Sequence, residues 1–132
     1  MEKYKEIQKE NTKLLNQFEE YLVQKNISKN TIKRHINNVE LYINDYLAID
    51  EEESPQEIEG YTLEVFFRWC IDKWIFNTVS ELLSMIISVD IFYEYLNENK
   101  PIAHIDKIRE ACAKKEDYTK KFKSHERLLD NI

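Results

Sequence analysis

The sequence contains one glycine and two prolines in 132 residues. Folds built from many short strands place glycine and proline at their turns, because these residues supply the backbone angles that tight turns need. A chain with so few of them has few turns to make, so turn-rich β architectures are excluded. The scarcity favours a small number of long helices, and we expect an all-α fold.

Several kinds of functional sequence are also missing. One glycine cannot build a glycine-rich phosphate loop, and the two cysteines, Cys70 and Cys112, do not have the spacing of zinc ligands. We therefore expect no cofactor, and we interpret the cysteines as free thiols in a reducing cytosol. The N-terminal residues MEKYKEIQKE lack the apolar core of an export signal, and no apolar run reaches the roughly 18 residues that span a membrane. These absences predict a cytoplasmic protein without a membrane partner.

Positive charge is missing from two long stretches. The chain has 19 Lys and Arg against 25 Asp and Glu, a net charge of −6. No Lys or Arg occurs between residues 36 and 67 or between 75 and 99, whereas bases gather in 25–34 and from residue 100 onward. A negative total counts against indiscriminate binding to a polyanionic nucleic acid. Because the charges are segregated, the segment 25–34 can still form a local basic surface.

Apolar residues recur at three- and four-residue steps along most of the chain, which is the period of an amphipathic helix. The predicted helices cover residues 4–25, 30–47, 62–74, 78–97 and 106–129. The acid-rich stretch 50–60, which contains Pro55 and Gly60, is predicted to be a loop. It is not a domain boundary, because the chain on either side of it is too short to fold separately. We expect a single domain over residues 1–132, with a core at about 12–103 and a charged C-terminal helix that frays or packs on a partner.

The fourth predicted helix should be the most buried, since it is apolar on several sides. The first half of the first helix is mostly charged and is expected to extend beyond the core. Ser28 or Asn30 is expected to cap the second helix. The residues predicted to be mostly buried are Phe18, Leu22, Ile36, Val39, Ile43, Phe66, Ile71, Leu83, Ile86 and Tyr93.

Two segments of the chain resemble a known family. In LLNQFEEYLVQKNISKNTIKRHINNVELYINDYL, a helix ends in F-x-x-Y-L, and Ser and Thr then begin a helix that closes in aromatic residues and a leucine. SELLSMIISVDIFYEYLNENKPI ends its helix in an aromatic pair, a leucine and a turn with Pro and Ile. Over about residues 12–103 the chain is similar to the N-terminal SAM-like, or core-binding, domain of tyrosine recombinases, the phage-integrase family. The resemblance implies a SAM-like bundle of four core helices plus a C-terminal helix.

In that family this domain clamps one face of duplex DNA with polar and basic side chains at the starts of its second and fourth helices. On the second helix the resemblance implies phosphate contacts from Lys29, Thr31, Lys33 and Arg34. The corresponding positions near the start of the fourth helix are Asn77, Thr78, Ser80 and Ser84. The fourth-helix positions contain no base, and Glu81 stands among them. Half of the implied DNA surface therefore lacks cations.

The chain does not carry the catalytic motif of the family. Recombinase catalysis uses a nucleophilic Tyr together with two Arg, a His-x-x-Arg motif and a Lys. Three residues after His35, His104 and His125 stand Asn38, Lys107 and Leu128, where the motif requires Arg. We therefore expect a module that is not an enzyme.

Other noticeable side chains have ordinary structural interpretations. Cys70 lies on an apolar helix face and is expected to be a buried small hydrophobe. His35 borders the apolar stripe of its helix and is expected at the core edge or the surface. Trp69 and Trp74 are expected to be core or interface anchors rather than platforms for stacked bases.

Two functions stay open. One is a stand-alone DNA-binding module derived from a recombinase, which binds duplex DNA weakly through the start of its second helix. The other is a helical protein-interaction module, with a protein partner or a second copy of itself, that has kept the fold and lost the DNA surface. The resemblance favours the first function and the charge distribution favours the second. If DNA binds elsewhere, the candidate residues are Lys114, Lys115, Lys120, Lys121 and Lys123.

Overall fold

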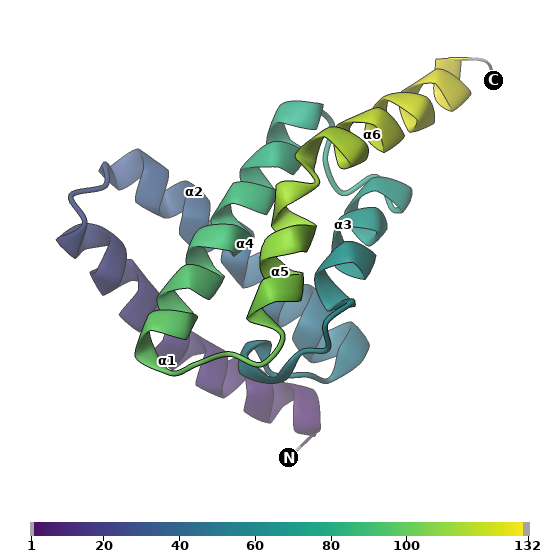
Figure 1. The fold of residues 1–132 in the computed structure, drawn as a ribbon. Coiled ribbons are helices and arrows are strands. Elements are labelled where there is room, and N and C mark those ends of the chain that lie inside the picture. Colours follow the sequence, from purple (N-terminus) through teal and green to yellow (C-terminus); the bar gives the residue numbers. More distant parts are fainter. Residues whose placement is uncertain (1, 131–132) are drawn as a thin grey trace.

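The computed structural model describes the backbone of residues 2–130 and the side chains of residues 2–128, and every regular element among them is helical (Figure 1). In chain order the elements are α1 (Lys3–Gln24), α2 (Lys29–Glu40), the π-helical segment η1 (Leu41–Glu51), the 3-10 turn η2 (Pro55–Glu57), α3 (Thr62–Asp72), α4 (Val79–Asn99), α5 (Ile105–Ala113) and α6 (Lys115–Asp130). The predicted all-α fold is confirmed. The specific SAM-like arrangement of four core helices stays a prediction.

The N-termini of α2 and α4 are capped by hydroxyl groups. Ser28 Oγ accepts a hydrogen bond from the amide of Thr31 over 3.3 Å, and Thr78 Oγ1 accepts one from the amide of Glu81 over 3.2 Å. Each cap satisfies an amide that the first helical turn leaves without a backbone partner. Of the two predicted caps, Ser28 and Asn30, the structure uses Ser28, and the fourth helix, predicted to start at residue 78, begins at Val79 with Thr78 as its cap.

The helices α1 and α3 are each followed by a left-handed residue that is not glycine. Asn26 follows α1 with a φ of 61°, and Trp74 follows α3 with a φ of 54°. In both turns the amide of the next residue donates to a carbonyl oxygen in the last turn of the helix, which is the Schellman motif. Because Trp74 belongs to this turn, α3 ends at Asp72, two residues before the predicted end.

The helical rod that begins with α2 is longer than predicted. It passes without a break into η1 and ends at Glu51. The first half of α1 packs against η1: the side-chain amide of Asn11 donates to the carbonyl oxygen of Ile43 over 3.0 Å, and that of Gln8 donates to the carbonyl oxygen of Asn44 over 3.1 Å. Asn11 is buried. The expectation that this half of α1 extends beyond the core is therefore wrong.

α4 lies in the middle of the bundle and contacts α1, α2, α3, α5 and α6 (Figure 1). It contributes the largest set of buried side chains of any element, because a helix that is apolar on most sides must be covered on most sides. Eight of the ten residues predicted to be buried are buried, while Ile36 and Leu83 are half-buried because each lines a surface groove. Neither α4 nor any other helix in the described part of the chain is long and apolar enough to cross a bilayer.

The C-terminal region forms two helices where one was predicted. α5 and α6 are separated at Lys114, and both pack against α3 and α4. Their buried side chains include Ile108, Cys112, Tyr118 and Phe122. The buried core therefore extends past residue 103, and only the last turns of α6 project from the bundle, at the upper right of Figure 1.

Two buried tyrosines fasten the acid-rich loop to the core. The hydroxyl of Tyr93 donates to the carbonyl oxygen of Pro55 in η2 over 2.9 Å, and the hydroxyls of Tyr42 and Tyr93 lie 2.7 Å apart. Since Tyr93 uses its only hydroxyl hydrogen on Pro55, Tyr42 is the donor between the two rings. These bonds hold the segment between η1 and α3 against the core, while the side chains of Asp50 and Glu51, at the end of η1, and of Glu52, just after it, remain exposed. The predicted loop therefore begins two residues later than expected.

Ile86 and Ile87 test this packing, because they are neighbours on α4 with 0% and 41% of their surface exposed. Replacing Ile86 by Ala should lower the free energy of unfolding by about 2–5 kcal/mol, since the truncation leaves a cavity in the core. The matched control Ile87→Ala should cost less than about 1 kcal/mol. Urea unfolding followed by circular dichroism measures both values, and equal losses would show that α4 buries a different face.

Candidate nucleic-acid interface

The candidate DNA-contacting residues of the second helix lie in the first two turns of α2. Lys29, Lys33 and Arg34 are exposed, and none of them forms an ion pair with another described residue. Thr31 is half-buried, and its Oγ1 accepts a hydrogen bond from Ser28 Oγ over 2.9 Å. The structure thus uses Thr31 in the helix cap and leaves the three cations in solvent.

The three cations point to two sides of α2. Lys29 and Lys33, one turn apart, line a groove between α1 and α2, whereas Arg34 lines a second groove between α2 and α4. Asn30 and Asn37 are exposed and, at 100° per residue, fall on the arc between Lys33 and Arg34. The outward face of α2 is therefore basic at its flanks and neutral and polar in the middle.

The α2–α4 groove, with a volume of about 460 Å³, combines both candidate sets. Arg34 and Asn38 line it from α2, and Ser80 and Ser84 line it from α4. Two of the four predicted fourth-helix positions therefore line the same groove as Arg34, although more than forty residues separate them from it in sequence. Leu83 and Ile87 supply apolar surface to the same groove.

The two other fourth-helix positions have different surroundings. Thr78 caps α4, and its hydroxyl also donates to Glu81 Oε1 over 3.1 Å. Asn77 is exposed just before the helix. Glu81 lines the α2–α4 groove, in the first turn of α4, where a carboxylate is stabilised by the positive end of the helix dipole. Its position at the helix start gives Glu81 a structural role that conflicts with anion binding in the groove.

A polar seam joins α2 to α4 beneath this groove. The side-chain amide of Asn38 donates to Ser84 Oγ over 3.1 Å and to Ser88 Oγ over 2.9 Å. His35 Nδ1 lies 2.7 Å from Ser88 Oγ, and Ser88 Oγ donates to the carbonyl oxygen of Ser84 over 3.0 Å. The directional bonds of the seam fix how far α2 can slide along α4.

The seam also determines which ring nitrogen of His35 carries a proton. Ser88 has one hydroxyl hydrogen, and when it is donated to the carbonyl of Ser84, Nδ1 of His35 must carry a proton. His35 is buried, and this burial, together with the nearby charge of Arg34, lowers its pKa. His35 is therefore a neutral core residue rather than the core-edge or surface residue that its position in the sequence suggested.

The sequence itself carries a signal for this seam. Ser80, Ser84 and Ser88 recur every four residues on the most apolar helix of the chain, so they form one polar row along α4. A polar row on a helix that must be buried predicts hydrogen-bond partners on a neighbouring helix. His35 and Asn38 supply those partners for Ser84 and Ser88.

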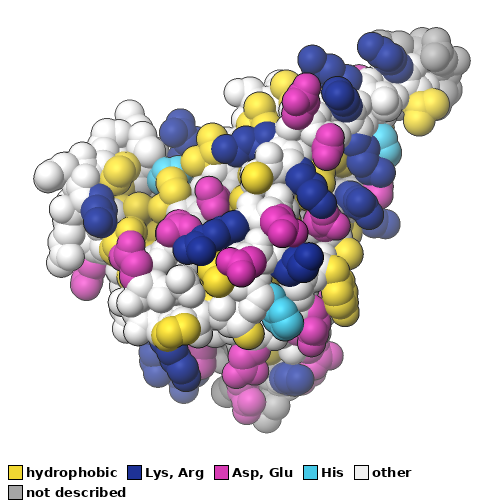
Figure 2. All heavy atoms as spheres, in the orientation of Figure 1, with side chains coloured by type: hydrophobic (Ala, Val, Ile, Leu, Met, Phe, Trp, Pro, Cys, Tyr) yellow, Lys and Arg dark blue, Asp and Glu magenta, His cyan; other side chains and the backbone are white. Residues whose placement is uncertain are grey.

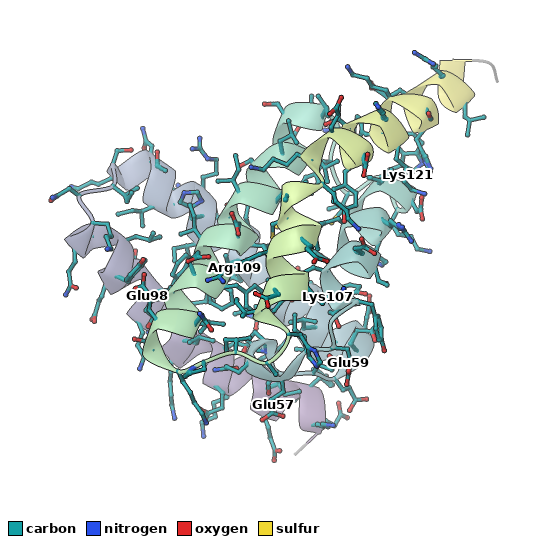
Figure 3. The ribbon with its side chains drawn as sticks, viewed as in Figure 1. Glu57, Glu59, Glu98, Lys107, Arg109 and Lys121 are labelled. Carbon is teal, nitrogen blue, oxygen red and sulfur yellow. The ribbon has the colours of Figure 1, made fainter. Side chains whose placement is uncertain are left out.

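The bases of α5 and α6 are in a different electrostatic setting. Figure 2 shows dark-blue and magenta side chains interspersed over these helices, and Figure 3 labels Lys107, Arg109 and Lys121 among them. The ion pairs in this region join Lys107 to Glu110 (3.5 Å), Arg109 to Glu94 (3.1 Å), Lys120 to Glu116 (4.0 Å), Lys121 to Asp72 (3.7 Å) and Lys114 to Glu64. Lys115 and Lys123 form no such pair with a described residue. Most of the alternative DNA-contacting lysines are thus partly neutralised by carboxylates.

The remaining candidates behave as structural residues. Cys70 and Cys112 are buried free thiols, and burial raises the pKa of both, so the prediction of Cys70 as a small hydrophobe is confirmed. Trp69 packs against Tyr46 with 5.0 Å between the ring centroids, whereas Trp74 is 42% exposed and meets His125 edge-on. Within residues 2–130 no group of three or more His, Cys, Asp or Glu side chains is arranged to hold a metal ion.

Comparison of the chain with models of protein families, with curated proteins and with solved structures finds no match. The resemblance to the recombinase core-binding domain therefore stays a prediction made from the sequence.

The lowered pKa of His35 predicts how stability changes with pH. The unfolded chain takes up a proton at His35 near pH 6.5, while the folded chain does so only at lower pH, so the unfolded state gains protons first as pH falls. The contribution of neutral His35 is thus complete above about pH 6.5 and is lost as pH falls through the folded pKa. Urea unfolding at pH 7.5 and 5.5 should show a larger loss of stability for the wild type than for His35→Gln. Equal losses would show that His35 does not titrate differently in the two states.

Proposed function

We propose that this chain is a non-catalytic helical module that binds duplex DNA weakly through the first two turns of α2. The observation that carries the proposal is that Lys29, Lys33 and Arg34 are all exposed and have no carboxylate partner among the described residues. Cations that are already hydrated and unpaired can bind phosphate without first breaking an ion pair.

The dimensions of this face suit a short contact with one strand. Residues 29–37 of α2 rise by about 12 Å, at 1.5 Å per residue. Successive phosphates of one strand advance by about 3.4 Å along the duplex axis, so the face spans three or four of them. Lys29, Lys33 and Arg34 would neutralise phosphates, while Asn30 and Asn37 would donate amide hydrogen bonds between them. The positive end of the α2 dipole adds to the attraction.

The α2–α4 groove extends this contact on the side of Arg34. Ser80 is exposed at the groove, and Ser84 is half-buried within it. A phosphate held by Arg34 would lie within reach of the Ser80 hydroxyl, which is the kind of neutral donor that positions a protein on the DNA backbone. Glu81 opposes this contact by repulsion, so we assign most of the affinity to α2.

Acidic surface limits the length of DNA that can be bound. The rod that begins with α2 carries Glu40, Asp45, Asp50 and Glu51 farther along, all exposed. A duplex that followed the rod past residue 37 would meet these carboxylates, so the contact is restricted to residues 29–37. The resulting contact is small, weak and sensitive to salt.

Protein interaction is the second candidate function, and one specific feature favours it. The groove between α1 and α2 has an apolar lining from Val23, Ile32 and Ile36, and Val23 is 58% exposed. An apolar groove that is rimmed by charged residues is a place where another chain can pack.

The double substitution Lys33→Ala/Arg34→Ala tests the DNA proposal. It should abolish binding of a labelled duplex while leaving the free energy of unfolding nearly unchanged, because both side chains are exposed. The matched control is Lys120→Ala/Lys121→Ala, which removes the same charge from α6 and should bind as the wild type does. Fluorescence anisotropy at low salt measures the affinity of each protein. For the wild type, log K should fall with log salt at a slope of about −3, as expected for three phosphate contacts.

Two results would contradict this proposal. A wild type without salt-sensitive binding at low salt would remove DNA as a ligand and leave the protein-interaction function. Binding that survives in Lys33→Ala/Arg34→Ala and disappears in the α6 control would move the DNA surface to the C-terminal lysines.

A further inference from the structure

The groove between α1 and α2 has an apolar floor and a protruding side chain. Its volume is about 450 Å³, and Ile32 and Ile36 of α2 form the floor. Val23, near the end of α1, stands at its edge with 58% of its surface exposed. A shallower hollow of about 280 Å³ continues from Val23 over the outer side of α1. An aliphatic side chain and a partly open aliphatic floor thus lie next to each other.

The two walls of the groove carry opposite charges. Glu19 lines the groove from α1, and Glu20 lines the adjoining hollow. Lys29 and Lys33 line the groove from α2. All four side chains are exposed, and no ion pair crosses the groove among the described residues. Each wall therefore keeps its charge available for another molecule.

We propose that this groove is the contact surface of a homodimer, in which a second copy of the chain docks through the same groove. A two-fold interface uses the same patch on both copies, so the patch must be complementary to itself. A groove with one acidic wall and one basic wall meets this condition. A patch with charge of a single sign would repel its own copy and would instead suit a partner of opposite charge.

The charges also specify the direction of the two-fold axis. An axis that runs along the groove places α1 of one copy over α2 of the other, so Glu19 and Glu20 face Lys29 and Lys33 twice. An axis that runs across the groove would place α1 over α1 and would oppose like charges. In the first arrangement Val23 of each copy is directed at the apolar floor of the other. The charge pattern therefore selects the axis along the groove.

The dimer should be weak, because a single groove buries much less area than a standard protein interface. We expect a dissociation constant on the order of 100 μM, and weaker association in high salt because the ion pairs lie at the rim. The inference does not depend on DNA binding. If both hold, they compete for Lys29 and Lys33, so added duplex should favour the monomer.

Charge reversal on one wall at a time provides the test. Glu19→Lys/Glu20→Lys makes both walls basic, and Lys29→Glu/Lys33→Glu makes both walls acidic. Each variant alone should be monomeric in sedimentation velocity at concentrations where the wild type dimerises. An equimolar mixture of the two should form a heterodimer at least as strong as the wild-type dimer, because every facing pair is then complementary. Circular dichroism and urea unfolding establish that each variant is folded, as expected for exposed positions.

A substitution without a charge change tests the apolar part. Val23→Ser should weaken the wild-type dimer by about tenfold or more, since it removes one aliphatic side chain from each copy. The inference is overturned if the wild type is monomeric throughout the measured range, if either charge variant alone dimerises as the wild type does, or if the mixture stays monomeric. Assemblies larger than a dimer would overturn the two-fold arrangement. The dimer test is independent of the DNA-binding test with Lys33→Ala/Arg34→Ala, because the Glu19→Lys/Glu20→Lys variant keeps all three cations of α2.

Discussion

The burial of α4 is the constraint on which the rest of this structure depends. A helix with apolar side chains on most of its circumference is stable in water only when other helices cover it on those sides. α1, α2, α3, α5 and α6 supply that cover. The charged C-terminal region, which has few apolar residues of its own, is held in the bundle for this reason: Ile108, Cys112 and Phe122 are directed inward against α3 and α4.

Hydrophobic burial has no direction, so polar contacts determine how the covering helices are aligned. The seam of His35, Asn38, Ser84 and Ser88 fixes α2 against α4, and Asn11 fixes α1 against η1. Each of these side chains is wholly or partly buried, and leaving one without its partner would cost about 1–3 kcal/mol. An arrangement with the helices shifted by one turn would lose these bonds, which gives the bundle one preferred register.

The distribution of ion pairs determines which charges of the surface remain without a partner. Carboxylates of α3, α4 and α6 pair with bases of α5 and α6, while the bases at the start of α2 have no such neighbours. The same unpaired cations form the DNA-contacting face that we propose and one wall of the α1–α2 groove. Both proposals thus rest on one electrostatic fact. They differ in what binds the cations: a phosphate backbone in the first proposal, or Glu19 and Glu20 of a second copy in the other.

The sequence by itself determined the helical class, most helix boundaries and the inward faces of the helices, because periodicity and capping are local properties. Ser28 as the cap of α2 and the burial of Ile86 could be predicted in this way. Only the tertiary structure showed the division of the C-terminal region into α5 and α6 and the end of α3 at Asp72, before the left-handed Trp74; at these two places Lys114 pairs with Glu64 and Trp74 meets the ring of His125, contacts between residues far apart in the sequence. The site shows the same division. Lys29, Lys33 and Arg34, and their spread around α2, could be predicted from local charge and helical periodicity, but which groove each of them lines depends on where α1 and α4 pack against the helix.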